Sequence, residues 1–186
     1  AEHASARDGN RAPYIARTTD FGTSWKMVTS GLPGDDASVR SLAEYPGRAN
    51  VVFAGTERAL FMSSDSGAHW TRLLANLPTT RYDDIIIHPR TKDLVLGTHG
   101  RSIWILDDAS PLAEFTPAIA AKKSHLFAVP RATLMLYWED VSNMAHQFFT
   151  AENPAEGATF TYHLAQSAQK VRLVVRGMNG KVIREV

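Results

Sequence analysis

The chain has 186 residues, of which 44% are hydrophobic and 21% are charged, a composition typical of globular proteins. Its 20 Lys and Arg residues nearly balance its 19 Asp and Glu residues. The resulting net charge of +1 argues against nucleic acid as a partner, because nucleic-acid binders usually carry a clear basic excess. The sequence has no Cys, which excludes disulfides, a thiolate nucleophile and zinc bound by cysteines.

No stretch of the sequence approaches the roughly 18 consecutive apolar residues of a transmembrane helix. The N-terminal residues 1–10 are polar and lack the apolar centre of a signal peptide. We therefore expect neither a membrane span nor a signal peptide in these residues.

Two segments share the pattern [S/T]-x-D-x-G-x-x-W. The first, TTDFGTSW, occupies residues 18–25, and the second, SSDSGAHW, occupies residues 63–70. The two aspartates, Asp20 and Asp65, lie 65 − 20 = 45 residues apart. Such self-similarity at a fixed spacing predicts a repeat architecture.

A third copy of the repeat is degenerate and ends the array. Residues 95–108 (VLGTHGRSIWILDD) match residues 52–65 (VFAGTERALFMSSD) without a gap, at an offset of 95 − 52 = 43 residues. Neither the Gly nor the Trp of the pattern follows Asp108.

The repeat predicts short β-strands. A period of about 45 residues with β-rich runs is typical of propeller blades of four strands. The expected third and fourth strands of one blade are Ala59–Ser63 and Trp70–Leu74, and the expected first and second strands of the next are Tyr82–His88 and Asp93–Thr98. The apolar run 85–87 lacks alternation, which predicts an innermost strand packed on both faces.

Each repeated segment predicts a structural turn between the third and fourth strands. It carries an Asp, a Gly and a Trp: Asp20, Gly22 and Trp25 in the first copy, and Asp65, Gly67 and Trp70 in the second. The carboxylate can accept backbone hydrogen bonds within its own turn, the glycine permits a positive φ, and the tryptophan opens the next strand with a large apolar ring. We favour this structural interpretation over a catalytic or calcium-binding role.

These segments resemble the Asp-box, or BNR repeat, of sialidases, sortilin-type Vps10 domains and xyloglucanase-like glycoside hydrolases. Residues 13–25, 54–70 and 88–108 look most like the large bacterial sortilin-like BNR-repeat proteins, which are often labelled glycosyl hydrolases. The resemblance covers roughly residues 12–138. It implies a β-propeller, a secreted or periplasmic location and a peptide or oligosaccharide ligand. It does not specify an activity, and no catalytic residue is carried over from these families.

Blade topology predicts which residues face a ligand. Alternate turns of an antiparallel blade lie on opposite faces, so the turns opposite the Asp motif share one face with the segments between blades. The expected ligand-binding residues there are Glu57, Arg58, Arg81, Tyr82, His99 and Arg101, and the segments between blades add Asp35, Asp36 and Arg40.

Asp83 and Asp84 are the candidate catalytic residues on this face. A glycosidase needs two carboxylates roughly 5–9.5 Å apart. Adjacent residues of a strand point to opposite faces, so at most one of the pair can face the channel. We favour a solvated loop of mixed charge over catalysis. No HxxH or HExxH spacing is present, and we expect no metal and no cofactor.

The remaining sequence predicts a link and a partial second β-domain. Thr116 is placed to cap a short helix that begins at Pro117, and apolar strand-like segments follow at 125–127 and 133–138. Three further strands, with a two-residue hairpin signal at Asn179-Gly180, resemble the opening of an immunoglobulin-like or FlgD-like β-sandwich: Thr159–Leu164, Val171–Arg176 and Lys181–Val186.

We therefore expect an all-β chain with terminal propeller blades over residues 1–108, a helical link over 109–152 and the first strands of a sandwich over 153–186. The expected function is a peptide- or glycan-binding or scaffold module, and the alternative is part of a sialidase-like or xyloglucanase-like glycoside hydrolase. A closed propeller of four or more blades needs about 180 residues for its blades alone. We therefore expect missing blades, or another chain, to cover the exposed blade edges.

Overall fold

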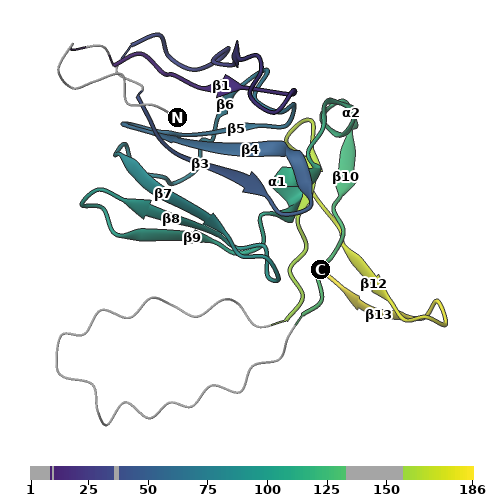
Figure 1. The fold of residues 1–186 in the computed structure, drawn as a ribbon. Helices are drawn as coiled ribbons and strands as arrows, with labels where there is room; N and C mark the ends of the chain where they lie inside the picture. Colours follow the sequence, from purple (N-terminus) through teal and green to yellow (C-terminus); the bar gives the residue numbers. More distant parts are fainter. Residues whose placement is uncertain (1–8, 10, 36–37, 133–156) are drawn as a thin grey trace, which may run out of the picture.

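The computed structural model describes residues 9, 11–35, 38–132 and 157–186. These residues form small antiparallel sheets and short helices, in agreement with the all-β class predicted from the sequence. Three of the sheets follow one another along the chain and lie side by side (Figure 1).

The first sheet is a hairpin of β1 (Ala16–Arg17) and β2 (Lys26–Met27). The middle sheet has the strand order β3-β4-β5-β6, and the last sheet has the order β7-β8-β9. The strands of the middle sheet are β3 (Val39–Tyr45), β4 (Arg48–Thr56), β5 (Leu60–Ser63) and β6 (Thr71–Arg72). Those of the last sheet are β7 (Tyr82–Ile87), β8 (Leu94–Thr98) and β9 (Ile103–Leu106).

The strand positions follow the sequence prediction closely. The repeated segment 18–25 joins β1 to β2, and the segment 63–70 joins β5 to β6, so both are turns between paired antiparallel strands. We call these two segments the Asp turns.

The aspartate of each Asp turn organises the backbone around it. Asp20 Oδ1 accepts the N–H of Ser24 at 2.9 Å, and its Oδ2 accepts the Ser24 hydroxyl at 2.6 Å. Asp65 Oδ1 accepts the N–H of His69 at 2.8 Å, and its Oδ2 lies 2.7 Å from the His69 Nδ1. Gly22 and Gly67 have φ values of +95° and +86° as expected, and the residue before each glycine is also left-handed.

These hydrogen bonds lower the pKa of both carboxyl groups to about 2. At Asp20 the largest cause is the hydrogen bond from the Ser24 side chain, followed by the bond from its N–H. At Asp65 partial burial acts in the opposite direction, and the bonds from His69 and from the Ser63 hydroxyl outweigh it. The aspartates thus stabilise turns, as the sequence predicted.

The tryptophans of the two Asp turns have different surroundings. Trp70 is 4% exposed and donates from Nε1 to the Val28 carbonyl of the first sheet at 2.8 Å. Trp25 is 64% exposed, and its Nε1 donates to Gly22 of its own turn at 3.1 Å. No sheet among the described residues lies beyond the first one, so nothing covers Trp25 as the first sheet covers Trp70.

Two hydrophobic cores join the three sheets. One lies between the first and middle sheets and is centred on Ala54, Phe61 and Trp70. The other lies between the middle and last sheets and contains Phe53 and Leu96. β7 lies directly against β3 and β4, so the innermost strands of the two larger sheets are neighbours.

The run 85–87 is only partly as predicted. Ile85 and Ile87 are 6% and 8% exposed and pack into the core, but Ile86 is 55% exposed. The expectation of an innermost strand packed on both faces is therefore wrong within the described residues, because no further sheet lies on the outer face of β7.

The array ends in a helix instead of a third Asp turn. α1 (Ser110–Glu114) follows β9 and buries Ala113 in the core between the middle and last sheets. Arg48 Nη1 of the middle sheet donates to the Ala113 carbonyl at 3.1 Å. α2 (Pro117–Ala120) then begins after Thr116, whose side chain accepts the N–H of Ile119 as the sequence predicted.

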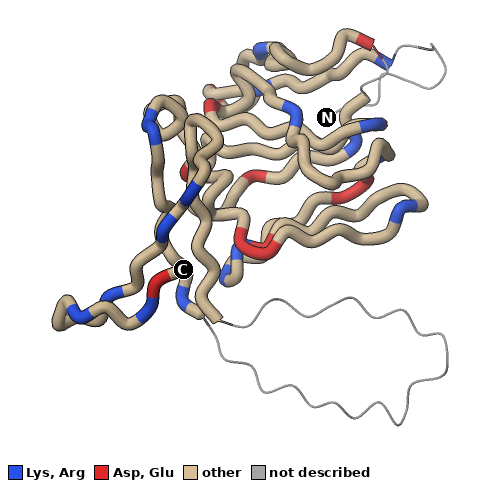
Figure 2. The backbone as a smooth tube through the Cα atoms, turned by 180° about the vertical axis from the view of Figure 1, so that it is seen from behind, with Lys and Arg blue, Asp and Glu red and all other residues tan. Residues whose placement is uncertain are grey.

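The C-terminal segments form two small hairpin-like sheets. β10 (Ser124–Leu126) pairs with β11 (Tyr162–Leu164), and β12 (Val174–Arg176) pairs with β13 (Val182–Glu185). The pairing of β10 with β11 joins the predicted link to the predicted sandwich segment. In the described residues these sheets remain two-stranded, and the expected strand at 133–138 lies outside them. The charged residues of the β12–β13 region are mostly Lys and Arg (Figure 2).

Candidate functional site

Two β-bulges mark the starts of the innermost strands. The register of β3 with β4 shifts at Arg40, and the register of β7 with β8 shifts at Asp83, so each of these is the extra residue of a bulge. The two positions are 83 − 40 = 43 residues apart, the offset of the repeat. A bulge redirects the side chain of its extra residue. The repeat therefore presents one redirected charged side chain from each of the two sheets.

The turn after the second strand of each sheet is tied to the segment before the bulge. The N–H of Glu57, after β4, donates to the Ser38 carbonyl at 3.2 Å. The N–H of His99, after β8, donates to the Arg81 carbonyl at 2.9 Å. These equivalent bonds hold Glu57 and His99 beside the bulge residues of their own sheets.

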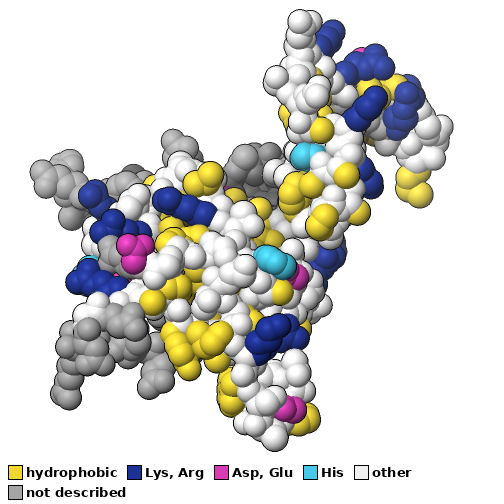
Figure 3. All heavy atoms as spheres, turned by 90° about the horizontal axis from the view of Figure 1, so that it is seen from above, with side chains coloured by type: hydrophobic (Ala, Val, Ile, Leu, Met, Phe, Trp, Pro, Cys, Tyr) yellow, Lys and Arg dark blue, Asp and Glu magenta, His cyan; other side chains and the backbone are white. Residues whose placement is uncertain are grey.

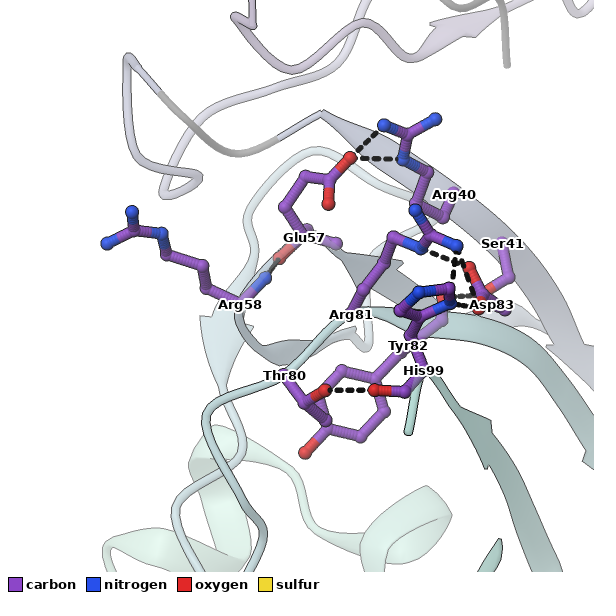
Figure 4. A network of polar contacts seen from close by, with 10 residues as sticks. Arg40, Ser41, Glu57, Arg58, Thr80, Arg81, Tyr82, Asp83 and His99 are labelled. Atoms are coloured by element: carbon purple, nitrogen blue, oxygen red, sulfur yellow. Dashed lines mark hydrogen bonds and ion pairs between the residues drawn. The ribbon is translucent and has the colours of Figure 1, made fainter. Parts of the chain in front are cut away.

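In the middle sheet, the bulge residue and the turn residue form an ion pair. Arg40 donates from Nε and Nη2 to Glu57 Oε1 (Figure 4). The two side chains are 29% and 22% exposed, so the pair is partly shielded from water. The Glu57 carboxylate is therefore held by a guanidinium group.

In the last sheet, three side chains form a cluster. Arg81 Nε donates to Asp83 Oδ1 at 2.6 Å, and Arg81 Nη2 donates to Asp83 Oδ2 at 3.2 Å. His99 Nδ1 lies 2.6 Å from Arg81 Nη2 and 3.2 Å from Asp83 Oδ2. The hydrogen bond from Arg81 is the main cause that lowers the pKa of Asp83, and partial burial opposes it.

The contacts of His99 depend on its protonation state. Neutral His99 with its proton on Nε2 accepts a hydrogen bond from Arg81 at Nδ1. Protonated His99 donates from Nδ1 to Asp83 instead and repels the Arg81 guanidinium.

Tyr82, which lies between Arg81 and Asp83 in the sequence, is a core residue. Its side chain is fully buried, and its hydroxyl donates to the Pro78 carbonyl at 2.7 Å. Burial raises the pKa of this phenol. The Tyr82 carbonyl accepts a hydrogen bond from Ser41 Oγ at 2.9 Å, which ties β7 to β3. The structure therefore places this predicted ligand-binding residue in the core.

Arg58 and Arg101 lie on the two turns. Both residues are exposed, and Figure 4 shows the Arg58 side chain directed away from the Arg81–Asp83–His99 cluster. The Arg101 carbonyl accepts a hydrogen bond from Trp104 Nε1 at 2.9 Å, which fixes the backbone of its turn.

The two catalytic candidates have different surroundings. Asp83 belongs to the cluster, whereas Asp84 pairs in register with Gly97 on the outer face of the last sheet. Asp84 Oδ1 accepts the N–H of Ile85 at 2.9 Å. Of the other two acidic residues expected nearby, Asp35 is exposed and Asp36 lies outside the described residues.

Two supporting residues, Ser41 and Thr80, were not singled out from the sequence as functional. Ser41 and Thr80 hold the backbone of Tyr82 and His99, the latter through a bond from Thr80 Oγ1 to the His99 carbonyl at 3.1 Å. Arg40 was placed on this face but not as a partner of Glu57. The offset of 43 residues, which aligns Arg40 with Asp83, was the available signal for both bulges.

The acidic side chains that cluster on this face are held in place by arginines. Both clustered carboxylates, Glu57 and Asp83, accept hydrogen bonds from arginines. Within the part of the chain that the structure describes, no group of three or more His, Asp or Glu residues is placed to hold a metal ion. The same residues include no helix long and apolar enough to cross a membrane.

A separate cavity of about 560 Å³ lies beside the Asp turns. Its lining includes Arg17, Trp25, Lys26 and His69. Figure 3 looks down on the side of β1 and shows hydrophobic and basic side chains intermixed at this surface. The residues that line the cavity lie near the Asp turns, whereas Glu57 and His99 lie at the opposite ends of the strands. The cavity is therefore separate from the clustered site.

Comparisons with family models, curated proteins and solved structures found no match to this chain.

Proposed function

We propose that the chain is part of a sortilin-like Asp-box β-propeller and acts as a recognition or scaffold module. Its ligand, a peptide or an oligosaccharide, binds at the face where Arg58 and Arg101 lie on the turns beside the Arg40–Glu57 pair and the Arg81–Asp83–His99 cluster. The observation that carries this proposal is the repeated bulge, which sets a paired acid and base at the same place in two successive sheets. Preorganised hydrogen-bonding groups of both signs suit polar recognition.

Binding has more support than hydrolysis. A glycosidase acid needs a carboxyl group with a raised pKa, and a second carboxylate must lie across the bond to be cleaved. Asp83 has a lowered pKa, and Arg81 donates hydrogen bonds to both of its oxygens. Asp84 lies on the outer face of the last sheet instead. Asp83 therefore lacks the raised pKa required of the acid in the alternative function, a glycoside hydrolase.

The proposed location is the bacterial periplasm or the exterior, which rests on the resemblance to sortilin-like proteins. The absence of Cys is compatible with export to either place.

Ligand binding is tested with peptide and oligosaccharide arrays, followed by calorimetry on the ligands retained. We expect saturable binding that Arg58→Ala and Arg101→Ala each weaken by about tenfold or more, because a hydrogen bond to a charged group contributes about 1.5–3 kcal/mol. Arg90→Ala is the matched control, since Arg90 is an exposed arginine in the turn at the other end of β7 and β8. Unchanged affinity in both Arg58 and Arg101 variants would contradict the assigned face, and the absence of saturable binding would contradict the function.

The same protein preparations test the alternative function, a glycoside hydrolase. We expect no turnover of aryl-glycosides by the wild-type chain. Turnover that Asp83→Asn or Asp84→Asn abolishes, without loss of folded structure by circular dichroism, would establish a hydrolase and overturn the binding-module proposal.

A further inference from the structure

The cavity beside the Asp turns has a counterpart one repeat later. The first cavity, of about 560 Å³, lies between the first sheet and the second Asp turn. The second cavity, of about 550 Å³, lies between the middle sheet and the segment from α1 to α2. Lining positions of the first cavity recur in the second at the offset of 45 residues: 17, 19, 24, 26 and 28 in the first, and 62, 64, 69, 71 and 73 in the second. The cavity is therefore a feature of the repeat.

The first cavity is not a consequence of the exposure of Trp25. The tryptophan equivalent to Trp25 beside the second cavity is Trp70, which the first sheet covers and which is only 4% exposed. The second cavity is nevertheless open to about the same volume. A sheet placed over Trp25 would therefore leave the first cavity open as well.

The two cavities differ in chemistry. The second is lined largely by apolar side chains, among them Met62, Leu73 and Phe115. The first has Arg17 at the position of Met62 and Lys26 at the position of Thr71. Among the described residues, no Asp or Glu lines the first cavity. The first cavity therefore carries two cations where its counterpart carries none.

These two cations form a like-charge pair across the strands. Arg17 and Lys26 are direct partners in the register of β1 with β2. Opposite residues of an antiparallel pair project to the same side with Cβ atoms about 4.5–5.5 Å apart, and like charges there are destabilising. Arg17 Nη1 donates to the Ser66 carbonyl at 3.2 Å, but within the described part of the chain no carboxylate pairs with either side chain. The equivalent pair of Met62 and Thr71 is neutral, so this turn does not require the two charges.

We propose that the first cavity binds an acidic saccharide, whose carboxylate or sulfate group lies between Arg17 and Lys26. An anion there removes the repulsion between the two side chains and accepts charge-assisted hydrogen bonds from both. The volume of the cavity lies within the range of about 300–1,000 Å³ that is typical of small-ligand sites. The site lies apart from the face of Arg58 and Arg101, and it does not depend on the ligand proposed for that face.

Hydroxyl groups in the lining favour a saccharide over an acidic peptide. Thr19, Thr29 and Ser30 line the cavity, and their side-chain hydroxyls form no hydrogen bond with other described residues. A hydroxyl both donates and accepts, and the hydroxyls of a sugar match it in both roles. An acidic peptide would pair with the two cations but offers few hydroxyls to the rest of the lining.

Calorimetry of the 186-residue chain with two acidic oligosaccharides tests the site. The probes are tetragalacturonate, which carries carboxylates, and sulfated isomaltotetraose. We expect saturable binding of at least one probe, weakened at least about tenfold when salt is raised from about 0.1 M to about 1 M, because the screening length falls from about 10 Å to about 3 Å. The methyl ester of tetragalacturonate and unmodified isomaltotetraose keep the sugar rings without the charge and should not bind. Saturable binding of neither acid, or equal binding of the neutral counterparts, would overturn the proposal.

Tetraglutamate distinguishes a saccharide site from a general anion site. It has carboxylates but no sugar hydroxyls, so we expect its affinity to be at least about tenfold weaker than that of the better oligosaccharide. Comparable affinity would overturn the assigned class of ligand.

Substitutions taken from the second cavity locate the bound probe. Arg17→Met and Lys26→Thr introduce the residues found at the equivalent positions, and each should lower the affinity by about tenfold. Lys181→Met is the matched control, since Lys181 is an exposed lysine between β12 and β13. Arg58→Ala and Arg101→Ala should also leave the affinity unchanged, and a loss in either would assign the probe to the other face and contradict this site.

The double variant Arg17→Met, Lys26→Thr should show no saturable binding. Circular dichroism should show that it is folded, because both residues already occupy the same positions in the next repeat. Undiminished binding by the folded double variant would contradict the site. Lys26→Gln, which removes the charge and keeps most of the side chain, provides an independent substitution if the double variant does not fold.

Discussion

Gly55→Ala probes the contact between the middle and last sheets. The new Cβ would lie 2.3 Å from Ser41 Oγ, 2.7 Å from the Tyr82 carbonyl oxygen and 2.8 Å from Tyr82 Cβ. The Ser41 hydroxyl can rotate away, which breaks its 2.9 Å hydrogen bond to the Tyr82 carbonyl. The backbone of β7 has no such freedom, so the two sheets must separate. Overpacking costs about 1–3 kcal/mol and the lost hydrogen bond about 1 kcal/mol, which gives a total loss of about 2–4 kcal/mol in the free energy of unfolding.

Urea unfolding of the 186-residue chain, followed by tryptophan fluorescence, measures this loss. For a chain of this size each kcal/mol corresponds to about 2–4 °C in Tm, so thermal unfolding provides a second measure. Gly97→Ala is the matched control. A Cβ at this position has only ordinary contacts, at 3.5 Å or more, and the alanine lowers the conformational entropy of the unfolded chain, which favours the folded state. We expect no loss of stability in that variant. Equal stability of the two variants would refute the packing of β7 over Gly55.

Two other predictions concern the Asp turns. Trp70→Ala should lower the free energy of unfolding by about 3–5 kcal/mol, because Trp70 is buried against the first sheet. Trp25→Ala should lower it by less than about 1 kcal/mol, because Trp25 is exposed. Similar losses for the two variants in urea unfolding would contradict this difference. The pKa values of Asp20 and Asp65 are lowered from 3.8 to about 2 on folding, so their contribution to stability is present above pH 3.8 and is lost as pH falls through about 2. Urea unfolding across this range should show a steeper fall for the wild type than for the Asp20→Asn, Asp65→Asn double variant, and parallel curves would contradict the assigned role of the carboxylates.

The parts of the fold that the sequence predicted well depend on local chemistry. The Asp turns were located correctly because Asp, Gly and Trp at fixed spacing determine hydrogen bonds and φ values within eight residues. The Thr116 cap was likewise correct, since capping involves a side chain and a backbone N–H three residues later. Such signals require no knowledge of the neighbouring sheets.

The parts that the sequence did not predict depend on register and on neighbours. The exposure of Ile86 follows from the absence of a covering sheet among the described residues, which periodicity does not reveal. Tyr82 was assigned to the ligand face by its place in a connecting segment. The bulge at Asp83 turns its side chain into the core instead, next to an exposed Asp83. A bulge shifts the alternation by one residue, so every inside-or-outside assignment near it depends on locating the bulge first.

The two bulges share a backbone hydrogen bond but differ in the charges of their side chains. Both bulges are fixed by the same backbone bond from the following turn, at Glu57 in one sheet and His99 in the next. The charges at these positions are reversed, since Arg40 faces Glu57 whereas Asp83 faces His99 and Arg81. A framework that needed particular charges for its stability would not exchange them, and partly exposed ion pairs contribute at most about 1 kcal/mol. The fold therefore does not require a particular charge at either bulge position.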